Sequence, residues 1–231
     1  MQTTLGRQDS SSVGTQMTVE NGVAVPGRNN PLSADARNKT LSAIPRSNGN
    51  GNGNGRLLVD TLCKSKLYQD YERAFSEATG QVLALRPVES WQLPHHGKRH
   101  ENPFCKLMAQ KSRACAACLQ VIEKLSERAV QQPASMTCAV GMCDTAVPVR
   151  LGDRVIGFLQ TGQVFRKKPT QAQFERTARL VAEWGVEVGR EELKAAYFAT
   201  PVISHAHHES VVRLLAIFAQ HLSILSNQVV V

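Results

Sequence analysis

Apolar and polar residues follow one another along this 231-residue chain in patterns that predict helices at both ends of a folded region and strands in its middle. Residues 1–55 lack such a pattern, because they are rich in Ser, Asn and Gly and end in SNGNGNGNG. A segment of this composition buries too little apolar surface to offset the entropy of ordering. We therefore predict a disordered leader over 1–55 and folded structure from Arg56 onward.

The first folded segment, RLLVDTLCKSKLYQDYERAFSEATG, has apolar residues at mostly helical spacing and ends at Gly80, a typical C-terminal stop. One long helix and two shorter helices with a break near Ser65 fit this pattern equally well. The next segment, QVLALRP, predicts a strand that ends at Pro87.

A second helical region follows a polar loop that contains PHHGKRHE. Asn102 precedes a proline, as is typical of the first turn of a helix, so we expect a helix from Phe104 to about Gln110. Ser112 is predicted to cap a longer helix that extends to about Gln131. One face of that helix carries Cys115, Cys118, Ile122, Leu125 and Ala129.

Three runs rich in Val and Ile then predict strands, and these are MTCAV, TAVPVRL and RVIGFLQTGQVF, with Gly152-Asp153 joining the last two. Helical patterns follow in QAQFERTARLVAEWG, which Thr170 can cap, and in EELKAAYF. A last long helix is expected from about Ser204 to Asn227. Helices that frame a small, mainly antiparallel sheet define an α+β fold.

The last helix carries apolar residues at alternating spacings of four and three, the pattern of a coiled-coil seam: Val211, Leu215, Phe218, Leu222, Leu225 and Val229. We therefore expect a homodimer through this helix. The alternative is that the helix only packs on its own domain. The expected organisation is a leader over 1–55, a folded domain over 56–203 and a C-terminal helix over 204–231.

The formal net charge of +8 would suit an acidic partner, but Lys and Arg are scattered among Asp and Glu rather than clustered. The sequence contains no basic stripe with interleaved aromatic residues, so it does not favour direct contact with nucleic acid. The N-terminus has no apolar core of the signal-peptide type, and no stretch approaches the roughly 18 apolar residues of a membrane span. We expect a cytoplasmic protein without a membrane partner.

Six cysteines point to specific chemistry, because cytosolic thiols are kept reduced and clustered ones indicate metal or redox sites. Cys115-Ala-Ala-Cys118 presents two thiols from one helical turn. Cys105, on the preceding helix, and Cys138, on the following strand, can complete a set of four sulfur ligands. A free cysteine also packs as a small apolar residue, and this is the interpretation for Cys63.

The cysteine spacing also allows other interpretations. Cys143 can replace Cys105 and give a spacing similar to that of a zinc finger, although such ligands are usually mounted on turns. Haem attachment requires a histidine where Leu119 stands, and a thioredoxin-like pair follows a strand. We predict no catalysis. The histidines of SHAHHE, and likewise His95, His96 and His100, are expected to be solvated, with a second metal site as the alternative.

Four segments taken together resemble the PocR-type sensory domain, a PAS-like ligand-binding module at the front of many bacterial AraC-type transcription regulators and some signalling kinases. These segments are HHGKRHENPFC, the C-x9-C-x2-C run through Cys118, CAVGMCDTAVPV and FLQTGQV. The resemblance covers roughly Leu57 to Gln228. It implies a PAS-like antiparallel sheet flanked by helices and a small organic effector, such as a short diol.

The resemblance also implies a shared metal-binding cluster at Cys105, Cys115, Cys118 and Cys138, with zinc as the expected ion and an iron–sulfur cluster as the alternative. Cys143 is a departure from the family pattern and leaves the fourth ligand open. Regulators of this kind continue into a helix-turn-helix domain, whereas this sequence ends at QVVV. We therefore expect DNA binding only through an effector domain that is not present in this chain.

A PAS-like domain holds its ligand between the sheet and the flanking helices, in a mostly apolar pocket with a few polar groups. Candidates for this pocket are Trp91, Asn102, Phe104, Gln160, Thr161 and Gln163. Trp91 and Phe104 can equally be ordinary core residues. The expected mechanism is that ligand binding, or oxidation of the thiolates, shifts the terminal helix between two arrangements. Two other classes remain open: a thiol or metal redox sensor without an organic ligand, and a zinc-dependent nucleic-acid-binding module.

Overall fold

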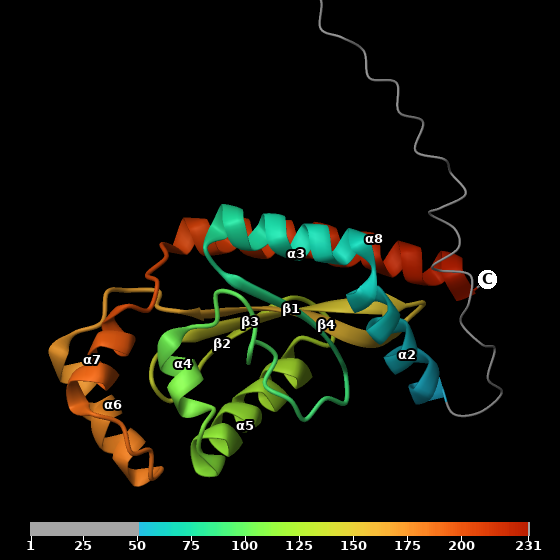
Figure 1. The fold of residues 1–231 in the computed structure, drawn as a ribbon. Helices are drawn as coiled ribbons and strands as arrows, with labels where there is room; N and C mark the ends of the chain where they lie inside the picture. Colours follow the sequence, from blue (N-terminus) through green and yellow to red (C-terminus); the bar gives the residue numbers. More distant parts are fainter. Residues whose placement is uncertain (1–50, 231) are drawn as a thin grey trace, which may run out of the picture.

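The computed structural model describes residues 51–230, which form a small antiparallel sheet with helices on both faces (Figure 1). Residues 1–50 of the leader predicted for 1–55 lie outside the described residues. Helix α2 (Gly51–Lys64) begins ahead of the expected start at Arg56. Among the described residues, the seven helices and the four-stranded sheet confirm the predicted α+β class.

The N-terminal helical segment is two helices, α2 and α3 (Lys66–Thr79), rather than one. The break falls at Ser65, whose side chain accepts a hydrogen bond from the backbone N–H of Tyr68 at 3.2 Å. Helix α3 ends at Gly80, which has a φ of 67°, a left-handed conformation that glycine adopts without steric cost. The chain then enters strand β1 (Val82–Pro87), as predicted.

The sheet has the order β1-β4-β3-β2, and every neighbouring pair is antiparallel. Strands β2 (Ala134–Thr137), β3 (Cys143–Leu151) and β4 (Arg154–Val164) form the predicted meander. Strand β4 is central and pairs Leu159 with Leu85 on one side and with Val147 on the other. Strand β2 ends before Cys138, so this cysteine lies in the turn between β2 and β3 rather than on a strand.

One face of the sheet is covered by α3 and by the long C-terminal helix α8 (His205–Val230), which run side by side in Figure 1. Helix α8 packs across β3, and the core between them contains Val211, Leu215, Phe218 and Leu222 together with Leu83, Val147 and Leu159. These α8 residues are the first four positions of the predicted coiled-coil seam. The seam face is therefore occupied by the chain's own sheet, as in the alternative interpretation.

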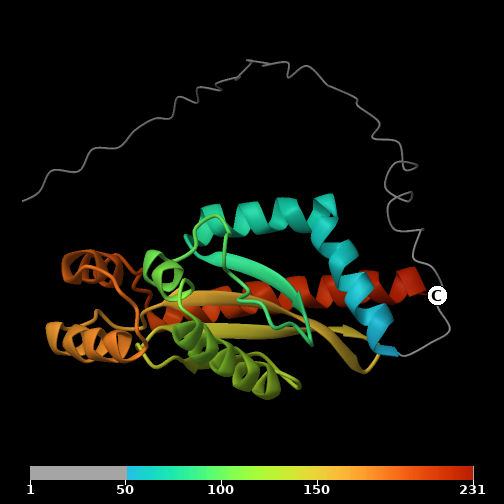
Figure 2. The same cartoon turned by 60° about the horizontal axis from the view of Figure 1, so that its bottom comes forward.

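The opposite face is covered by α4 (Pro103–Met108) and α5 (Ser112–Arg128), which come forward in Figure 2. Helix α5 packs Leu125 and Ala129 against Ala146 and Phe158 of the sheet. The predicted cap at Ser112 is wrong, because Lys111 occupies the N-cap position and makes no side-chain cap hydrogen bond. Helices α6 (Gln171–Glu183) and α7 (Arg190–Phe198) complete a second core around Phe104, Phe174 and Tyr197.

Helix α8 is also the one described segment, His205–Gln228, that is long and apolar enough to cross a membrane by length and composition. This corrects the expectation that no stretch approaches a membrane span. The feature is weak evidence for a membrane helix, because core helices pass the same test. Here Val211, Leu215 and Leu222 supply apolar side chains to the domain core.

Candidate functional site

Three of the four predicted cysteine ligands line one cavity of about 70 Å³ on the α4–α5 side of the sheet. Cys105 comes from α4, Cys118 from α5 and Cys138 from the turn after β2. Phe104 and Gln163, two of the predicted ligand residues, line the same cavity. We call this space the cysteine cavity.

Local hydrogen bonds hold two of these thiols in place. The side-chain oxygen of Asn102 caps α4 by accepting hydrogen bonds from the backbone N–H groups of Phe104 and Cys105, at 2.9 and 3.3 Å. Its side-chain nitrogen donates to the backbone oxygen of Gln163 and to the hydroxyl of Thr200. In the turn after β2, the N–H of Cys138 donates to the oxygen of Met142 at 2.8 Å. Asn102 thus fixes α4 relative to β4.

The environment of the three thiols keeps them protonated at neutral pH. Burial raises the pKa of Cys118 to about 12 and that of Cys138 to about 11, and it raises the pKa of Cys105 well above its ordinary value. The nearby carboxyl of Asp144 acts in the same direction on all three. Because the thiolate is the reactive form, these cysteines are poor nucleophiles unless a cation lowers their pKa.

The other cysteines lie elsewhere. Cys115 is half-buried on α5 and does not line the cysteine cavity. Cys143 is buried beside Val164 and Ile203, where its sulfur lies 3.9 Å from Nε2 of His208. Cys63 packs against the main core, as the sequence predicted. The structure therefore gathers three of the four expected cysteines at one cavity, whereas Cys115 and Cys143 do not line it.

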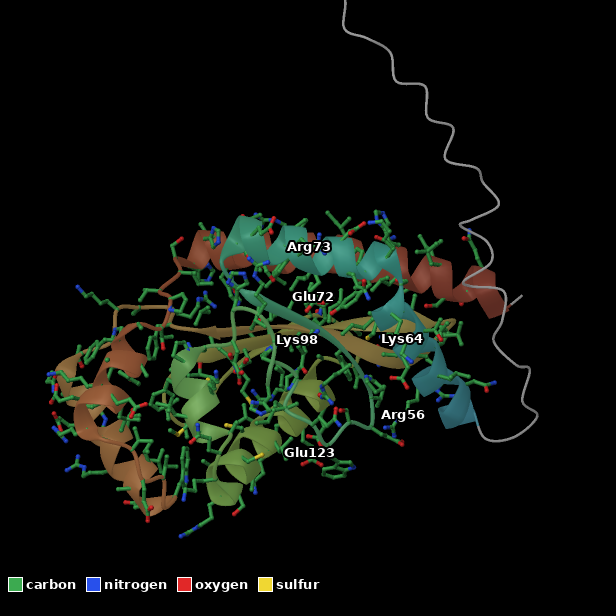
Figure 3. The ribbon with its side chains drawn as sticks, viewed as in Figure 1. Arg56, Lys64, Glu72, Arg73, Lys98 and Glu123 are labelled. Carbon is green, nitrogen blue, oxygen red and sulfur yellow. The ribbon has the colours of Figure 1, made fainter. Side chains whose placement is uncertain are left out.

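His95 also lines the cysteine cavity, a position that the sequence did not predict. It was expected to be solvated, but it is only 2% exposed and both of its ring nitrogens lack hydrogen-bond partners. Burial lowers the pKa of His95 to about 3, assisted by the positive charges of Lys98 and Arg86. Lys98 in turn forms an ion pair with Glu72 of α3 at 2.7 Å, which ties this loop to the body of the domain (Figure 3).

Asp144 completes the polar lining of the cavity. Its Oδ1 atom lies 3.8 Å from Nε2 of His95. Burial raises the pKa of Asp144 to about 7, although a hydrogen bond from the backbone of Gln163 opposes that shift. The cavity thus combines neutral thiols, a neutral imidazole and a carboxyl group that is partly protonated near neutral pH.

The donor types at this cavity fit zinc, which binds thiolate sulfur and imidazole nitrogen. The unpartnered nitrogens of His95 also fit an environment that a cation would complete. Within residues 51–230, however, no three His, Cys, Asp or Glu side chains are arranged closely enough to hold an ion as they stand. A metal at this cavity would require the side chains to move toward one another.

A second and larger cavity, of about 440 Å³, lies between β1, β4 and the outer part of α5. Trp91, another predicted ligand residue, lines it and is 78% exposed. Arg86 and Phe158 come from the sheet, whereas Ile122 of α5 borders both this space and the cysteine cavity. We call this space the Arg86 cavity.

The remaining predicted ligand residues have structural hydrogen bonds. Gln160 is buried on β4 and accepts a hydrogen bond from Nε of Arg86 at 2.6 Å. Thr161 is buried and donates to the backbone oxygen of Val82 at 2.7 Å. Neither residue lines the cysteine cavity or the Arg86 cavity. Gln160 nevertheless influences the Arg86 cavity, because its hydrogen bond orients the guanidinium group of Arg86.

An antiparallel sheet with cavities under the helices of one face is an arrangement suited to binding a small molecule inside a domain. The chain matches the description "Sensory domain found in PocR" over residues 61–227. It belongs to this family of sensory domains, which confirms the resemblance seen in the sequence. No curated protein and no solved structure matches the chain.

Proposed function

We propose that this chain is a cytoplasmic ligand-sensing domain of a bacterial transcription regulator and that it binds a small organic effector. The observation that carries this proposal is the pair of adjoining cavities between the sheet and α5 in a member of a sensory-domain family. A cavity of about 440 Å³ has room for a small organic molecule, since roughly 10–15 Å³ already suffices for one water. The effector occupies the Arg86 cavity, and the cysteine cavity is a structural or sensory element beside it.

The signal passes from the sheet to α8. Two hydrogen bonds support this route: the N–H of Arg150 donates to the hydroxyl of Ser223 at 2.8 Å, and the N–H of Gly152 donates to Oδ1 of Asn227 at 2.7 Å. A ligand that moves β3 or β4 therefore changes the position of α8. DNA is reached only through an effector domain that α8 would join.

The homodimer expected from the sequence uses a different face of α8. Leu214, Ile217 and Ile224 are 41%, 55% and 48% exposed, and with His221 they repeat the spacings of three and four that suit a helix pair. Cysteines placed at Ile217 and Ile224 in a background depleted of native cysteines will form intermolecular crosslinks. A cysteine at the buried Phe218 is the matched control. Crosslinking at Phe218 without crosslinking at Ile217 would contradict this dimer.

The metal of the cysteine cavity is proposed to be zinc, held by Cys105, Cys118 and Cys138 with His95 as the fourth ligand. When bound, the ion would supply charge that keeps the thiolates deprotonated and would clip α4 and α5 to the turn after β2. Elemental analysis and an absorption spectrum of protein purified without oxygen test this. Stoichiometric zinc supports a structural clip, iron with visible absorbance indicates a redox-linked sensor, and protein that takes up neither metal rejects the metal site.

Calorimetric titration with a panel of short diols and other small organic molecules tests the sensing function. Saturable binding of one member supports it. Thiol counts before and after peroxide treatment test the redox alternative, which the raised pKa values of the buried thiols disfavour. The nucleic-acid alternative requires salt-dependent DNA binding by this chain alone.

A further inference from the structure

The floor of the Arg86 cavity is a buried arginine without a carboxylate partner. Arg86 is 5% exposed, and among the ion pairs of residues 51–230 none includes it. Its guanidinium group donates through Nε to Gln160, through Nη1 to the backbone oxygen of Ser90 and through Nη2 to the hydroxyl of Ser126. All three acceptors are neutral. Because a guanidinium group carries five N–H groups, two are left for a ligand.

The guanidinium group is held ready for an anion. Its hydrogen bond to Gln160 and its position over the ring of Phe158, 5.8 Å from the ring centre, fix its orientation. Burial lowers the pKa of Arg86 to about 10, which reflects the unfavourable desolvation of a charge that has no counter-ion. A carboxylate on the two remaining N–H groups would offset that cost and form a charge-assisted pair of fixed geometry.

The rest of the cavity has the opposite charge. Glu123 and Glu127 line it from α5, where both are exposed (Glu123 is labelled in Figure 3), and Glu89 lines it from the loop after β1. Trp91 adds an aromatic surface that is largely free of protein contact. Acidic side chains beside an indole ring favour an ammonium group. The apolar side chains between floor and mouth are Leu119, Ile122, Val130 and Phe158.

We propose that the Arg86 cavity binds a small amino acid in its zwitterionic form. The carboxylate pairs with Arg86, the ammonium group lies toward Glu123, Glu127 and Trp91, and the short carbon chain contacts the apolar wall. This inference rests on the proposed sensing function and gives its effector a chemical class. It separates the amino acid from a diol, which would leave Arg86 without an anion.

Calorimetry with four molecules of similar length tests the proposal on the full chain: γ-aminobutyrate, butyrate, butylamine and butanediol. We expect γ-aminobutyrate to bind at least about tenfold more tightly than each of the others, because only it satisfies both ends of the cavity. Arg86→Met abolishes that binding. Arg128→Met, which removes an exposed arginine of α5 that does not line the cavity, leaves it unchanged.

A second variant guards against misfolding of Arg86→Met. The double substitution Glu123→Gln and Glu127→Gln alters only exposed groups, so the protein folds and its affinity for γ-aminobutyrate falls to that for butyrate. Tighter binding of butanediol than of γ-aminobutyrate overturns the amino-acid inference but supports the sensing function. Failure of all four molecules to bind also overturns the inference, and the wider diol panel then decides the sensing function separately.

Discussion

Nε2 of His95 lies 3.8 Å from Oδ1 of Asp144, so the loop before α4 contacts strand β3 at the wall of the cysteine cavity. Burial holds His95 neutral and raises the pKa of Asp144 to about 7. The contact joins a loop residue that looked solvated in the sequence to a strand residue next to Cys143. In the proposed zinc site, His95 would be the fourth donor beside the three thiols that line the cavity.

This arrangement predicts unequal roles for the cysteines. If the cysteine cavity binds zinc as proposed, Cys138→Ser will lower the affinity of the protein for zinc at least about tenfold, because it removes one of the three proposed sulfur ligands. Cys115→Ser is the matched control and will change the affinity little, since Cys115 lies on the same helix as Cys118 but outside the cavity. Competition with a chromophoric zinc chelator measures both. Equal losses in the two variants would favour the four-cysteine set expected from the sequence.

The cysteines show which parts of the site local sequence patterns can predict and which they cannot. The sequence placed Cys105 and Cys118 on their helices because helical spacing is a local property. It could not place Cys138 in a turn, because β2 ends at Thr137 and only pairing with β3 decides that end. The burial of His95 was also beyond the sequence, since it depends on how a polar loop folds over the sheet.

Phe218→Ala on α8 will lower the free energy of unfolding by about 3–5 kcal/mol, the usual range for removing a buried phenylalanine. Phe218 is 6% exposed and stacks on Tyr71 with ring centres 3.4 Å apart. Gln220→Ala, two residues away on the same helix but exposed and outside the proposed dimer contacts, will change it by no more than about 0.5 kcal/mol. Urea unfolding of both variants measures the difference. Similar small effects at the two positions would mean that α8 does not pack on the sheet through Phe218.

The same helix shows why the sequence could not distinguish a coiled-coil seam from a face that packs on the domain core. Spacings of three and four mark the face of a helix that packs on any surface, whether a second helix or a sheet. Val211, Leu215 and Leu222 follow this spacing and pack on β3 within the domain. Only the fold distinguishes them from Leu214, Ile217 and Ile224, which repeat the spacing on the exposed side.

Gly162→Ala will lower the free energy of unfolding by at least about 2 kcal/mol. Gly162 has a φ of 149°, and a Cβ atom there would lie 2.6 Å from Cα of Asp144 and 2.7 Å from the oxygen of Cys143. Both atoms are backbone of the paired strand, so neither can move aside cheaply. The control is Gly152→Ala, at a φ of 59° with no atom within 4 Å of the added carbon. Gly152→Ala will lower the free energy of unfolding by about 1–2 kcal/mol, because alanine is disfavoured in this left-handed backbone conformation. A smaller loss at Gly162 than at Gly152 would contradict the close approach of β3 and β4.

His208 couples α8 to the sheet through a buried hydrogen-bond chain. Nδ1 of His208 lies 3.1 Å from Nη1 of Arg166 and accepts its hydrogen bond, so Nε2 carries the proton and donates to the hydroxyl of Thr145 at 3.0 Å. Burial lowers the pKa of His208, and the charges of Arg166 and His205 act in the same direction, whereas Glu209 opposes them. The folded protein therefore holds this imidazole neutral below the pH at which the unfolded chain protonates it.

The sign of the resulting pH dependence follows from proton binding. Below about pH 6.5 the unfolded chain binds a proton at position 208 that the folded protein does not, so acidification lowers the free energy of unfolding by up to about 1.4 kcal/mol per pH unit. In His208→Gln this contribution is absent. The loss of stability between about pH 7.5 and about pH 5, on either side of the ordinary histidine pKa, will therefore be smaller in this variant than in the wild type. His207→Gln, at an exposed neighbouring position, is the control and will keep the wild-type dependence. Denaturant unfolding of the three proteins at the two pH values gives the three differences needed. If His208→Gln loses as much stability on acidification as the wild type, His208 is not held neutral, and the chain from Arg166 to Thr145 does not link α8 to the sheet in the way its geometry indicates.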